Sequence, residues 1–421
     1  MEDQNPWWFN EEDETYQEWK NSEIKWIPKV IEKIDLKPFS LHFLVGPRQI
    51  GKTTLLKILI HRLIQKQNPK SVFYFSCDEI LDYKELGEVL DNYLSFRDTN
   101  HIKSSIIILD EITYVEEWFR AIKYRIDSGK FKNDVLIITG STSIEVLKER
   151  ERFPGRRGNG KDIFFYPMDF SEYIEHFSSL KLTKYRLSLN NIELALKANT
   201  AFKKSINELF RKYLVTGGFP LSIKDVFQKG KVSQKTFKTT LEWMKNDWKK
   251  AGKDERYMKE IISYLLKARL SPISWNCIAK ETSVNSPHTV ESYINVLKDT
   301  FCAKVLNQIA PDSKILYRKN KKIHFIDPLI YHVLSKYTKE KVYEEQMVES
   351  VVVSHLSRLT DVYFWKNKSE VDVIAIVNKK QVGFEVKWGF KSYRKPRHLK
   401  FLFKLDKENL ATFLSSIDWL A

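Results

Sequence analysis

The sequence predicts an α/β fold: a parallel β-sheet covered by helices, followed by a helical region and a smaller helix-and-hairpin unit. Three observations support this prediction. In the first 141 residues, short apolar runs alternate with helical segments, which is typical of strands buried on both faces. After about residue 170 the pattern becomes helical and polar. From about residue 254, three helical stretches precede an alternating basic segment, as in a winged helix-turn-helix.

Several apolar runs are the expected strands of the parallel sheet. They are rich in β-branched and aromatic residues, and helical stretches separate them. They lie at the start of 40–64 and within 71–79, 104–112 and 133–141. Near the C-terminus, the pattern of 369–389 predicts two further strands joined by a short polar turn.

Length and composition indicate a folded protein of two to four domains. The chain has 421 residues, of which 43% are hydrophobic. No apolar run approaches the length of a membrane span, and the acidic N-terminus lacks a signal-peptide pattern. Cys77, Cys277 and Cys302 lie far apart and form no CxxC pair. We therefore expect no membrane partner and a cytoplasmic location.

The charge of the chain predicts a polyanionic partner. The formal net charge is +16. The segments 314–322 and 379–407 are strongly basic and carry interleaved aromatic side chains. Such segments suit nucleic-acid backbones, and DNA is the expected partner, although a solvated basic face is an equal alternative for either segment alone.

The sequence "GPRQIGKT", from Gly46 to Thr53, matches the phosphate-binding pattern G-x-x-x-x-G-K-[ST]. It follows an apolar strand and begins a helix, which is the context that the motif needs. Gly46 and Gly51 allow backbone N–H groups to surround phosphate oxygens, and the helix N-terminus adds a favourable dipole. Lys52 would contact the β- and γ-phosphates, Thr53 would ligate Mg²⁺, and Thr54 completes the set. The motif predicts ATP and Mg²⁺ as cofactors.

Two acids end the expected strand "IIILDE" and complete the predicted nucleotide site. Asp110 would hold the magnesium shell, and Glu111 would orient and polarise the attacking water. At the end of the next strand, Thr139 and Ser141 are candidates for contact with the γ-phosphate. Ordinary polar residues at a strand end are an equal alternative for these two.

The loop "RFPGRRG" carries two adjacent arginines, Arg156 and Arg157. An arginine can stabilise the charge on a nucleotide that is bound by a neighbouring subunit. Arg156 is therefore a candidate catalytic residue, and a homo-oligomer is a candidate assembly.

The C-terminal hairpin carries charges inside otherwise apolar strands. Because alternate side chains of a strand share a face, Glu370 and Asp372 point to one side, as do Glu385 and Lys387. Burial of such charges is costly unless they pair or hold a metal ion. The pattern alone fits either a salt-bridged sheet edge or a metal site.

The ordered set of motifs resembles the archaeal-type AAA-like ATPases that join a P-loop domain to a winged helix and a C-terminal restriction-endonuclease-like domain. The matching pieces include "NPWW", "GPRQIGKTTLL", "LDEITYVEEW", "PGRRG", "TGGFP", "KIHFIDPLIYHVL", "YFWKNKSEVDVIAI" and "VGFEVKWG". The resemblance implies a P-loop domain with an N-terminal extension, a helical lid, a winged-helix domain and a nuclease-like domain. These would span 1–170, 171–250, 251–338 and 339–421 respectively.

The hairpin is similar to the core of PD-(D/E)xK nucleases, in which an acid on one strand precedes Glu-x-Lys on the next. The resemblance implies that Asp372 and Glu385 bind Mg²⁺ or Mn²⁺, with Lys387 beside them and Glu349 contributed by the preceding helix. Residue 371 is Val, so the "PD" pair itself is absent. Carboxylates suit a hard cation, and the cation would activate water and neutralise the scissile phosphate.

The expected function is therefore ATP hydrolysis combined with metal-dependent cleavage of DNA. One alternative is an ATP-switched DNA-binding regulator whose nuclease-like domain only holds DNA. A second is a nucleotide-dependent interaction protein with no DNA substrate. Retention of Glu349, Asp372, Glu385 and Lys387 favours cleavage.

Overall fold

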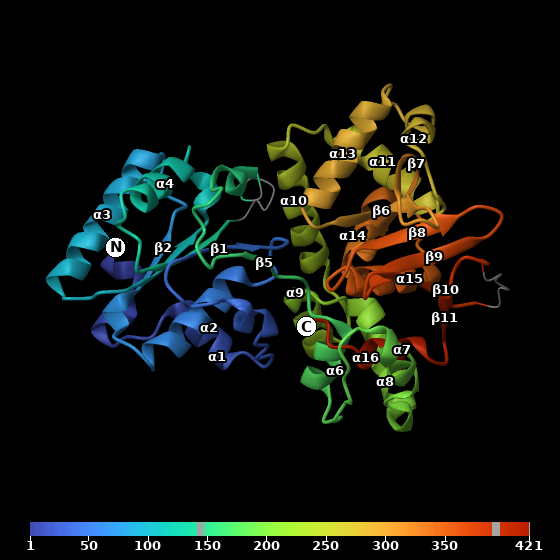
Figure 1. Ribbon diagram of the computed structural model, residues 1–421, viewed down its shortest axis with the longest axis horizontal. Coiled ribbons are helices and arrows are strands. Elements are labelled where there is room, and N and C mark those ends of the chain that lie inside the picture. The colour runs from blue at the N-terminus through green and yellow to red at the C-terminus, as the bar shows by residue number, and fades with distance from the viewer. Residues whose placement is uncertain (141–145, 147, 390–395, 421) are drawn as a thin grey trace. The chain divides into compact units, whose positions relative to one another are not determined.

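The computed structural model describes residues 1–140, 146, 148–389 and 396–420 (Figure 1). The chain divides into two compact units, Met1–Tyr166 and Pro167–Ala421. The division lies close to the predicted boundary after residue 170, whereas the predicted boundaries after residues 250 and 338 lie inside the second unit.

The first unit is built on a five-stranded parallel sheet with the order β2-β3-β4-β1-β5. The strands are β1 (Ser40–Val45), β2 (Val72–Ser76), β3 (Ile106–Asp110), β4 (Val135–Thr139) and β5 (Asp162–Phe164). Every residue of β1, β3 and β4 is buried, as expected for a parallel sheet that helices cover. The predicted parallel α/β sheet is confirmed.

One helix precedes these strands, and others connect them. In the first unit they are α1 (Glu14–Asn21), α2 (Lys52–Ile64), α3 (Tyr83–Thr99) and α4 (Phe119–Asp127). Helix α1 packs against α2, and α3 packs against α4 (Figure 1). Short 3-10 helices complete the unit: Glu2–Gln4, Pro6–Phe9, Lys29–Lys33, Pro69–Ser71, Ile112–Tyr114 and Arg150–Arg152.

The N-terminal segment covers the edge strand β2 through side chains that imitate a neighbouring strand. The Asn5 amide donates to the carbonyl oxygen of Tyr74 (2.9 Å) and accepts from its backbone N–H (2.8 Å). The indoles of Trp7 and Trp8 both donate to the carbonyl oxygen of Val72. These contacts explain the tryptophans near the start of the chain.

The second unit begins with a helical region that matches the polar helical pattern after residue 170. Its helices are α6 (Phe170–Phe177), α7 (Leu189–Lys197), the 3-10 turn Thr200–Phe202, α8 (Lys203–Thr216), α9 (Pro220–Lys229) and α10 (Gln234–Lys250). Helix α6 begins with a capping box: the Asp169 carboxylate accepts the N–H of Glu172 at 2.9 Å.

A six-stranded sheet with the order β11-β10-β9-β8-β6-β7 forms the rest of the second unit. Its strands are β6 (Ala303–Ile309), β7 (Ile315–Phe325), β8 (Val362–Lys366), β9 (Glu370–Val377), β10 (Lys380–Lys387) and β11 (Phe401–Asp406). The accompanying helices are α11 (Glu255–Lys267), α12 (Trp275–Glu281), α13 (Pro287–Asp299), α14 (Pro328–Thr338), α15 (Glu344–Leu356) and α16 (Leu410–Ser415).

The hairpin β6–β7, expected as a wing, is continuous with the sheet of the nuclease-like region. Strand β6 runs antiparallel to β7 and meets β8 in parallel through the pair Gln308 and Phe364. The three helices and the hairpin of the expected winged helix are present at the predicted places. Their hairpin nevertheless shares a sheet with β8–β11, so the region 251–338 is joined to 339–421 by backbone pairing.

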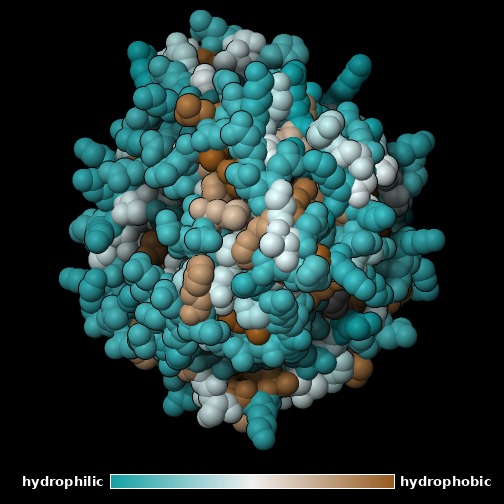
Figure 2. Space-filling view, turned by 90° about the vertical axis from the view of Figure 1, so that its left-hand side faces the viewer, coloured by the Kyte–Doolittle hydropathy of each residue, from teal (hydrophilic) through white to brown (hydrophobic). Residues whose placement is uncertain are grey.

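One face of the chain is largely polar. Figure 2 shows a face on which hydrophilic residues predominate and apolar side chains are scattered in small groups. Among the described residues, none of the helices has the length and apolar character that crossing a bilayer requires.

Candidate functional site

The phosphate-binding loop lies between β1 and α2, where the sequence predicts it. Gly51 adopts a left-handed conformation (φ 93°) directly before the first turn of α2, which holds Lys52, Thr53 and Thr54. Gly46 has no room for a side chain, because a Cβ there would lie 2.2 Å from the carbonyl oxygen of Phe165. The two glycines of the motif are thus required by backbone geometry and by close packing respectively.

The amine of Lys52 is buried and folded over the loop. It donates to the carbonyl oxygens of Gly46 (3.0 Å) and Pro47 (3.1 Å). A phosphate group placed in the loop would offer this ammonium a stronger, charged acceptor than the two carbonyls.

Thr53 and Asp110 meet at the expected magnesium position. The Thr53 hydroxyl donates to Asp110 Oδ2 at 2.7 Å, and Asp110 ends the buried strand β3. The Tyr74 hydroxyl donates to the same oxygen at 3.1 Å, and the backbone N–H of Glu111 donates to the other at 2.9 Å. A hydroxyl and a carboxylate that converge in this way supply the oxygen ligands that Mg²⁺ prefers.

Tyr74 is a site residue that sequence reasoning missed. It lies on β2, next to the strand that carries Asp110, and its phenol is buried. Burial, then the negative charge of Asp110, raise the pKa of Tyr74 well above its usual value. Its hydroxyl therefore remains a donor to the carboxylate. Tyr74 lies two residues before the end of its strand, and this position in the sequence could have indicated a residue of the site.

Lys57 was also missed. It lies one turn beyond Thr53 on α2 and is buried. Its ammonium pairs with Asp13 at 2.8 Å and lies 3.4 Å from the ring centroid of Tyr74. Burial lowers the pKa of Lys57, against the opposing effect of Asp13. A cleft of about 760 Å³ lies beside these residues and is lined by Thr53, Ser76 and the acidic segment 11–14.

The other predicted residues of the nucleotide site that the structure describes lie just after β3 and at the end of β4. Glu111 directly follows β3 in a left-handed conformation (φ 53°). Thr139 ends β4, and its buried hydroxyl has no hydrogen-bond partner among the described residues. Such an orphaned hydroxyl at the edge of the sheet fits the predicted contact with a phosphate or water. Ser141 lies outside the described residues.

The two arginines of the loop "PGRRG" have different environments. Arg156 pairs with Asp127 at 2.6 Å on the surface. Arg157 pairs with Asp162 on β5 at 2.8 Å, and its guanidinium lies 5.0 Å from the ring centroid of Phe43. Arg157 therefore belongs to the packing of the sheet, which leaves Arg156 as the better candidate for contact with a second molecule.

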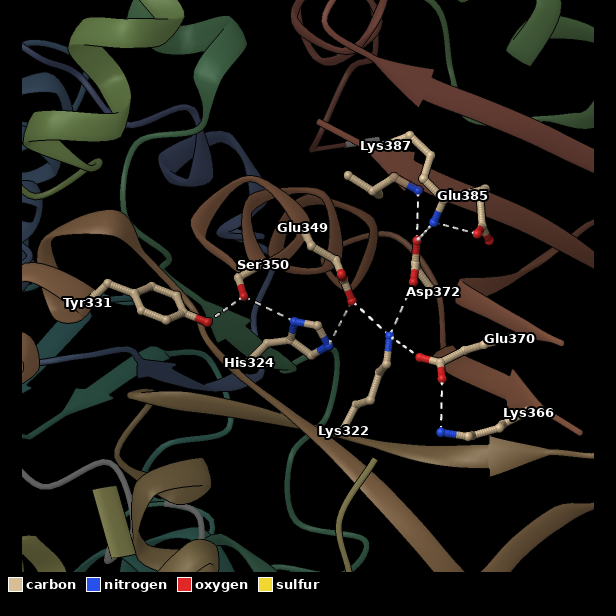
Figure 3. Close-up of polar contacts among 11 residues, drawn as sticks. Lys322, His324, Tyr331, Glu349, Ser350, Lys366, Glu370, Asp372, Glu385 and Lys387 are labelled. Atoms are coloured by element: carbon tan, nitrogen blue, oxygen red, sulfur yellow. Dashed lines mark hydrogen bonds and ion pairs between the residues drawn. The ribbon is translucent and has the colours of Figure 1, made fainter. Parts of the chain in front are cut away.

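In the second unit, the structure brings together all four predicted residues of the nuclease-like site (Figure 3). Asp372 lies on β9, Glu385 and Lys387 lie on β10, and Glu349 lies on α15. The Lys387 ammonium is 3.3 Å from Asp372 Oδ2 and 2.6 Å from Glu385 Oε1. Asp372 Oδ2 also accepts the backbone N–H of Val386 at 3.0 Å.

Lys322 completes this group and was not predicted as a site residue. It lies on β7, and its side chain is only 2% exposed. Its ammonium is 3.0 Å from Glu349 Oε1, 2.8 Å from Glu370 Oε1 and 3.3 Å from Asp372 Oδ1 (Figure 3). We call Lys322, Lys387, Glu349, Glu370, Asp372 and Glu385 the acid–lysine cluster.

Burial changes the acidity of the cluster. It raises the pKa of Glu349 to about 7, against the effect of Lys322, and the charge of Asp372 adds to the increase. Burial and then Asp372 raise the pKa of Glu385. For Lys322, burial alone would lower the pKa, but the charges of Glu349, Asp372 and Glu370 raise it above the usual value.

Two buried polar atoms of this region have no hydrogen-bond partner among the described residues. They are Glu385 Oε2 and His324 Nε2. The His324 ring faces Glu349 at 4.0 Å, while its other nitrogen contacts the Ser350 hydroxyl at 3.0 Å (Figure 3). Buried polar atoms without partners are rare in native proteins and indicate a ligand or water that satisfies them.

The cluster opens into a cavity of about 260 Å³ whose lining is rich in charged side chains. The lining includes Arg269, Lys322, Tyr343, Glu349, Lys366, Glu370, Asp372, Lys387 and Trp388. Both signs of charge are therefore available to a ligand that enters the cavity.

The donor set fits a divalent cation in kind: several carboxylates lie close together, and one buried carboxylate oxygen is unpartnered. Its arrangement is different, since within the described ranges no three acidic, histidine or cysteine side chains are placed to share one metal ion. Lys322 and Lys387 lie between the carboxylates instead. The metal-binding role of Asp372 and Glu385 stays a prediction.

Two segments of the chain match known protein families. Residues 39–174 match the AAA domain family, and residues 207–341 match a family described as a domain of unknown function. A protein of Methanocaldococcus jannaschii, described as uncharacterized protein MJ1637, is 31% identical over 203 residues. That match covers 47% of this chain and 41% of the relative, so it spans about two fifths of the relative's length.

Solved structures give a more distant likeness. The Walker-type ATPase PABY2304 of Pyrococcus abyssi has 12% identity and a TM-score of 0.45, with 70% of this chain and 90% of that chain covered. The ORC2 protein of Aeropyrum pernix has 11% identity and a TM-score of 0.37, over 72% of this chain and 89% of that one. The RuvB Holliday junction branch migration motor of Thermotoga maritima has 14% identity and a TM-score of 0.32, over 80% and 97%. With TM-scores below 0.5, these likenesses do not bear on function.

The AAA domain match and the geometry of the phosphate-binding loop agree with each other. The match begins one residue before β1 and includes Lys52, Thr53, Asp110 and Glu111. Residues 39–174 thus match the AAA domain family and carry a phosphate-binding loop between a buried strand and a helix.

Proposed function

We propose that this chain hydrolyses ATP in its first unit and acts on DNA, which its second unit cleaves with the help of a divalent cation. The observation that supports ATP hydrolysis most strongly is the hydrogen bond between Thr53 and Asp110 beside the buried amine of Lys52. These residues come from a loop and from a distant strand, yet they meet where a nucleotide with its magnesium would lie.

The roles of the residues follow from their positions. Lys52 would exchange its carbonyl acceptors for phosphate oxygens and so neutralise charge that develops during transfer. Thr53 and Asp110 would hold Mg²⁺, which neutralises charge on the β- and γ-phosphates. Glu111 would orient the attacking water, and the orphaned hydroxyl of Thr139 would contact that water or the γ-phosphate.

The test of ATP hydrolysis uses two variants. Lys52→Ala should weaken nucleotide binding, because the ammonium that faces the phosphates is lost. Glu111→Gln should bind ATP but hydrolyse it at least about a hundredfold more slowly, in line with the loss of a general base. Lys66→Ala, which removes an exposed lysine just beyond α2, is the matched control. Hydrolysis at the parental rate by both site variants would refute the assignment.

The proposed cleavage of DNA is supported by the contact of Asp372, Glu385 and Lys387 on two adjacent strands beside a charged cavity. Asp372 and Glu385 would bind Mg²⁺ or Mn²⁺, and a bound cation would polarise a water and the phosphodiester. Lys387 would place a positive charge beside the phosphate, and Glu349 would reach the same cavity from α15. DNA is the proposed substrate because the chain carries a net charge of +16.

Cleavage should be measured with full-length protein, Mg²⁺ or Mn²⁺, and single-stranded, duplex and branched DNA, with and without ATP. Asp372→Ala and Glu385→Ala should abolish cutting while ATP hydrolysis and most DNA binding remain. Asp361→Asn, an exposed carboxylate just before β8 in the same sheet, should cut like the parent. Cutting that survives both site variants and chelation would eliminate the proposed site.

A second candidate function has its own support. Lys322 and Lys387 already neutralise the carboxylates, as in a site that is purely structural. On this reading the chain is an ATP-switched DNA-binding regulator. It would then bind DNA with an affinity that depends on ATP but would cut none of the three DNA forms with either metal ion.

A further inference from the structure

Lys322 occupies the centre of the acid–lysine cluster, and its chemistry there differs from that of Lys387. Its ammonium contacts three carboxylates, Glu349, Glu370 and Asp372, at 2.8–3.3 Å. An ammonium buried to this degree is stable only when such acids surround it. The three acids, equally, would repel one another if Lys322 were absent.

A divalent cation would use the same oxygens. Magnesium binds carboxylate oxygens at about 2.0–2.1 Å, so it cannot lie between Glu349 and Asp372 while the ammonium contacts both. The cavity of about 260 Å³ beside the cluster includes Lys322 in its lining and also reaches Tyr343 and Arg269. It provides space into which the flexible lysine side chain can withdraw.

We infer that Lys322 is a resident counter-cation, and that a divalent cation binds Glu349 and Asp372 only by displacing it. The inference rests on the proposed metal-dependent cleavage. Lys322 would hold the carboxylates together in the metal-free protein. Because Lys322 lies on β7, this strand would control the binding of the metal ion. Glu385 Oε2 is consistent with this inference, since it is a buried carboxylate oxygen of the cluster with no hydrogen-bond partner among the described residues and so offers a further ligand to a cation.

The test is a titration of the full-length chain with Mn²⁺ in the absence of nucleotide. The concentration of free Mn²⁺ is measured by its electron paramagnetic resonance signal. Asp372→Asn identifies the signal of this site, because it leaves the magnesium ligands of the first unit intact. In Lys322→Met, the site that depends on Asp372 should bind Mn²⁺ at least about tenfold more tightly, since the competing charge is gone. Lys380→Met is the control: it removes an exposed lysine at the start of β10 that does not line the cavity, and the affinity should stay within about twofold.

A second readout uses heat. With chelator present, Lys322→Met should unfold at a lower temperature than the parent, because Glu349, Glu370 and Asp372 have lost their shared cation. Added Mn²⁺ should raise this temperature more in the variant than in the parent. If Lys322→Met fails to fold, Lys322→Met combined with Glu370→Gln removes one charge of each sign and should retain the tighter binding of Mn²⁺.

The outcomes separate the inference from the function on which it rests. Equal or weaker Mn²⁺ binding by Lys322→Met, at a site that Asp372→Asn abolishes, would overturn the displacement while leaving the metal site in place. If neither the parent nor the Lys322 variants bind Mn²⁺ in a manner that depends on Asp372, both the metal site and the displacement are wrong.

Discussion

At the scale of single residues, Asp225 shows how a carboxylate that belongs to neither proposed site can be held in its charged form. It lies on α9 and accepts hydrogen bonds from the backbone N–H of Ser233 (2.9 Å), the Lys229 ammonium (2.9 Å) and the Thr236 hydroxyl. Burial alone would raise the pKa of Asp225, but these hydrogen bonds, with that of Ser233 the largest, lower it well below the usual range. The carboxylate joins the end of α9 to the start of α10.

Replacement of Asp225 should therefore have an effect that depends on pH. Because the folded-state pKa is lowered, the stabilisation is present above the unfolded pKa of about 3.9 and is lost as the pH falls. Asp225→Asn should reduce the free energy of unfolding by about 2 kcal/mol at pH 7. The difference from the parent should shrink progressively below about pH 4. Thermal unfolding at several pH values measures this difference in stability, and Glu208→Gln, at an exposed position of α8, is the control. A difference in stability that does not change with pH would contradict the lowered pKa of Asp225.

At the scale of elements, the N-terminal segment protects an exposed strand edge and also supports the nucleotide site. An edge strand presents unpaired backbone groups, and here Asn5 satisfies both groups of Tyr74. The side chain of Gln4 accepts the N–H of Ser76 at 2.6 Å, two residues farther along β2. Since Tyr74 contacts Asp110, the N-terminal segment indirectly positions the proposed magnesium ligand.

Asn5→Ala tests this support. It should leave the buried N–H and C=O of Tyr74 without partners, at a cost of about 2–4 kcal/mol in the stability of the first unit. ATP affinity should fall as well, because Tyr74 and Asp110 lose their fixed positions. Thermal unfolding and nucleotide titration are the measurements, and Gln17→Ala, at an exposed position of α1, is the matched control. An unfolding temperature of Asn5→Ala equal to that of the parent would show that the edge of β2 does not need these hydrogen bonds.

Within the second unit, strand β7 combines two environments that its sequence does not distinguish. Its pairing with β6 shifts between Asn307 and Gln308, so that residues 317–320 bulge outward and are exposed. The following residues, 321–325, are buried. Lys321 and Lys322 belong to the basic segment 314–322, which was expected to contact nucleic acid, but they are buried and are therefore not surface residues. The Lys321 amine donates to the carbonyl oxygens of Tyr317 and Lys319, and Lys322 lies in the acid–lysine cluster. Within the bulge, the exposed basic residues are Arg318 and Lys319.

At the scale of the whole molecule, the net charge of +16 predicts DNA binding that weakens with salt. Each phosphate contact that is lost should lower the slope of log affinity against log salt concentration by about 0.9. Arg318→Ala combined with Lys319→Ala should thus reduce the slope by about two units and weaken binding for all sequences alike. Fluorescence anisotropy over a salt series measures this, with Lys231→Ala as a control of equal charge type. An unchanged slope would show that residues 317–320 do not contact DNA.

Assembly is a second property of the whole molecule that can be tested. We propose that Arg156, which pairs only with the exposed Asp127 among the contacts described, acts on the nucleotide of a second copy. Arg156→Ala should slow ATP hydrolysis while leaving ATP binding intact. Mixing it with Lys52→Ala should restore part of the activity, because each variant supplies the residue that the other lacks. Arg157→Ala should instead lower the stability of the first unit, since it loses Asp162. No recovery on mixing would exclude action between subunits.

Local pattern alone was sufficient for the phosphate-binding loop and the parallel sheet. A glycine-rich loop between an apolar strand and a helix has few alternative geometries, and buried strands of a parallel sheet are continuous apolar runs. The contact of Asp372 with Lys387 was equally accessible, because a short turn joins β9 to β10 and the alternation of side chains determines which residues share a face. In each case the interacting residues are close in sequence or belong to one repeating pattern.

Only the tertiary structure decided which distant residues join these sites. Asn5 reaches Tyr74 across 69 residues, and Lys322 reaches Asp372 across 50. The basic run that contains Lys322 looks like a solvated surface in sequence, because charge and composition do not record burial. Burial of Lys322 depends on the pairing of β6 with β8, which places β7 beside the acids of α15 and β9. The sequence by itself thus determined the chemistry that each site can offer, whereas long-range pairing of strands decided which charges meet there.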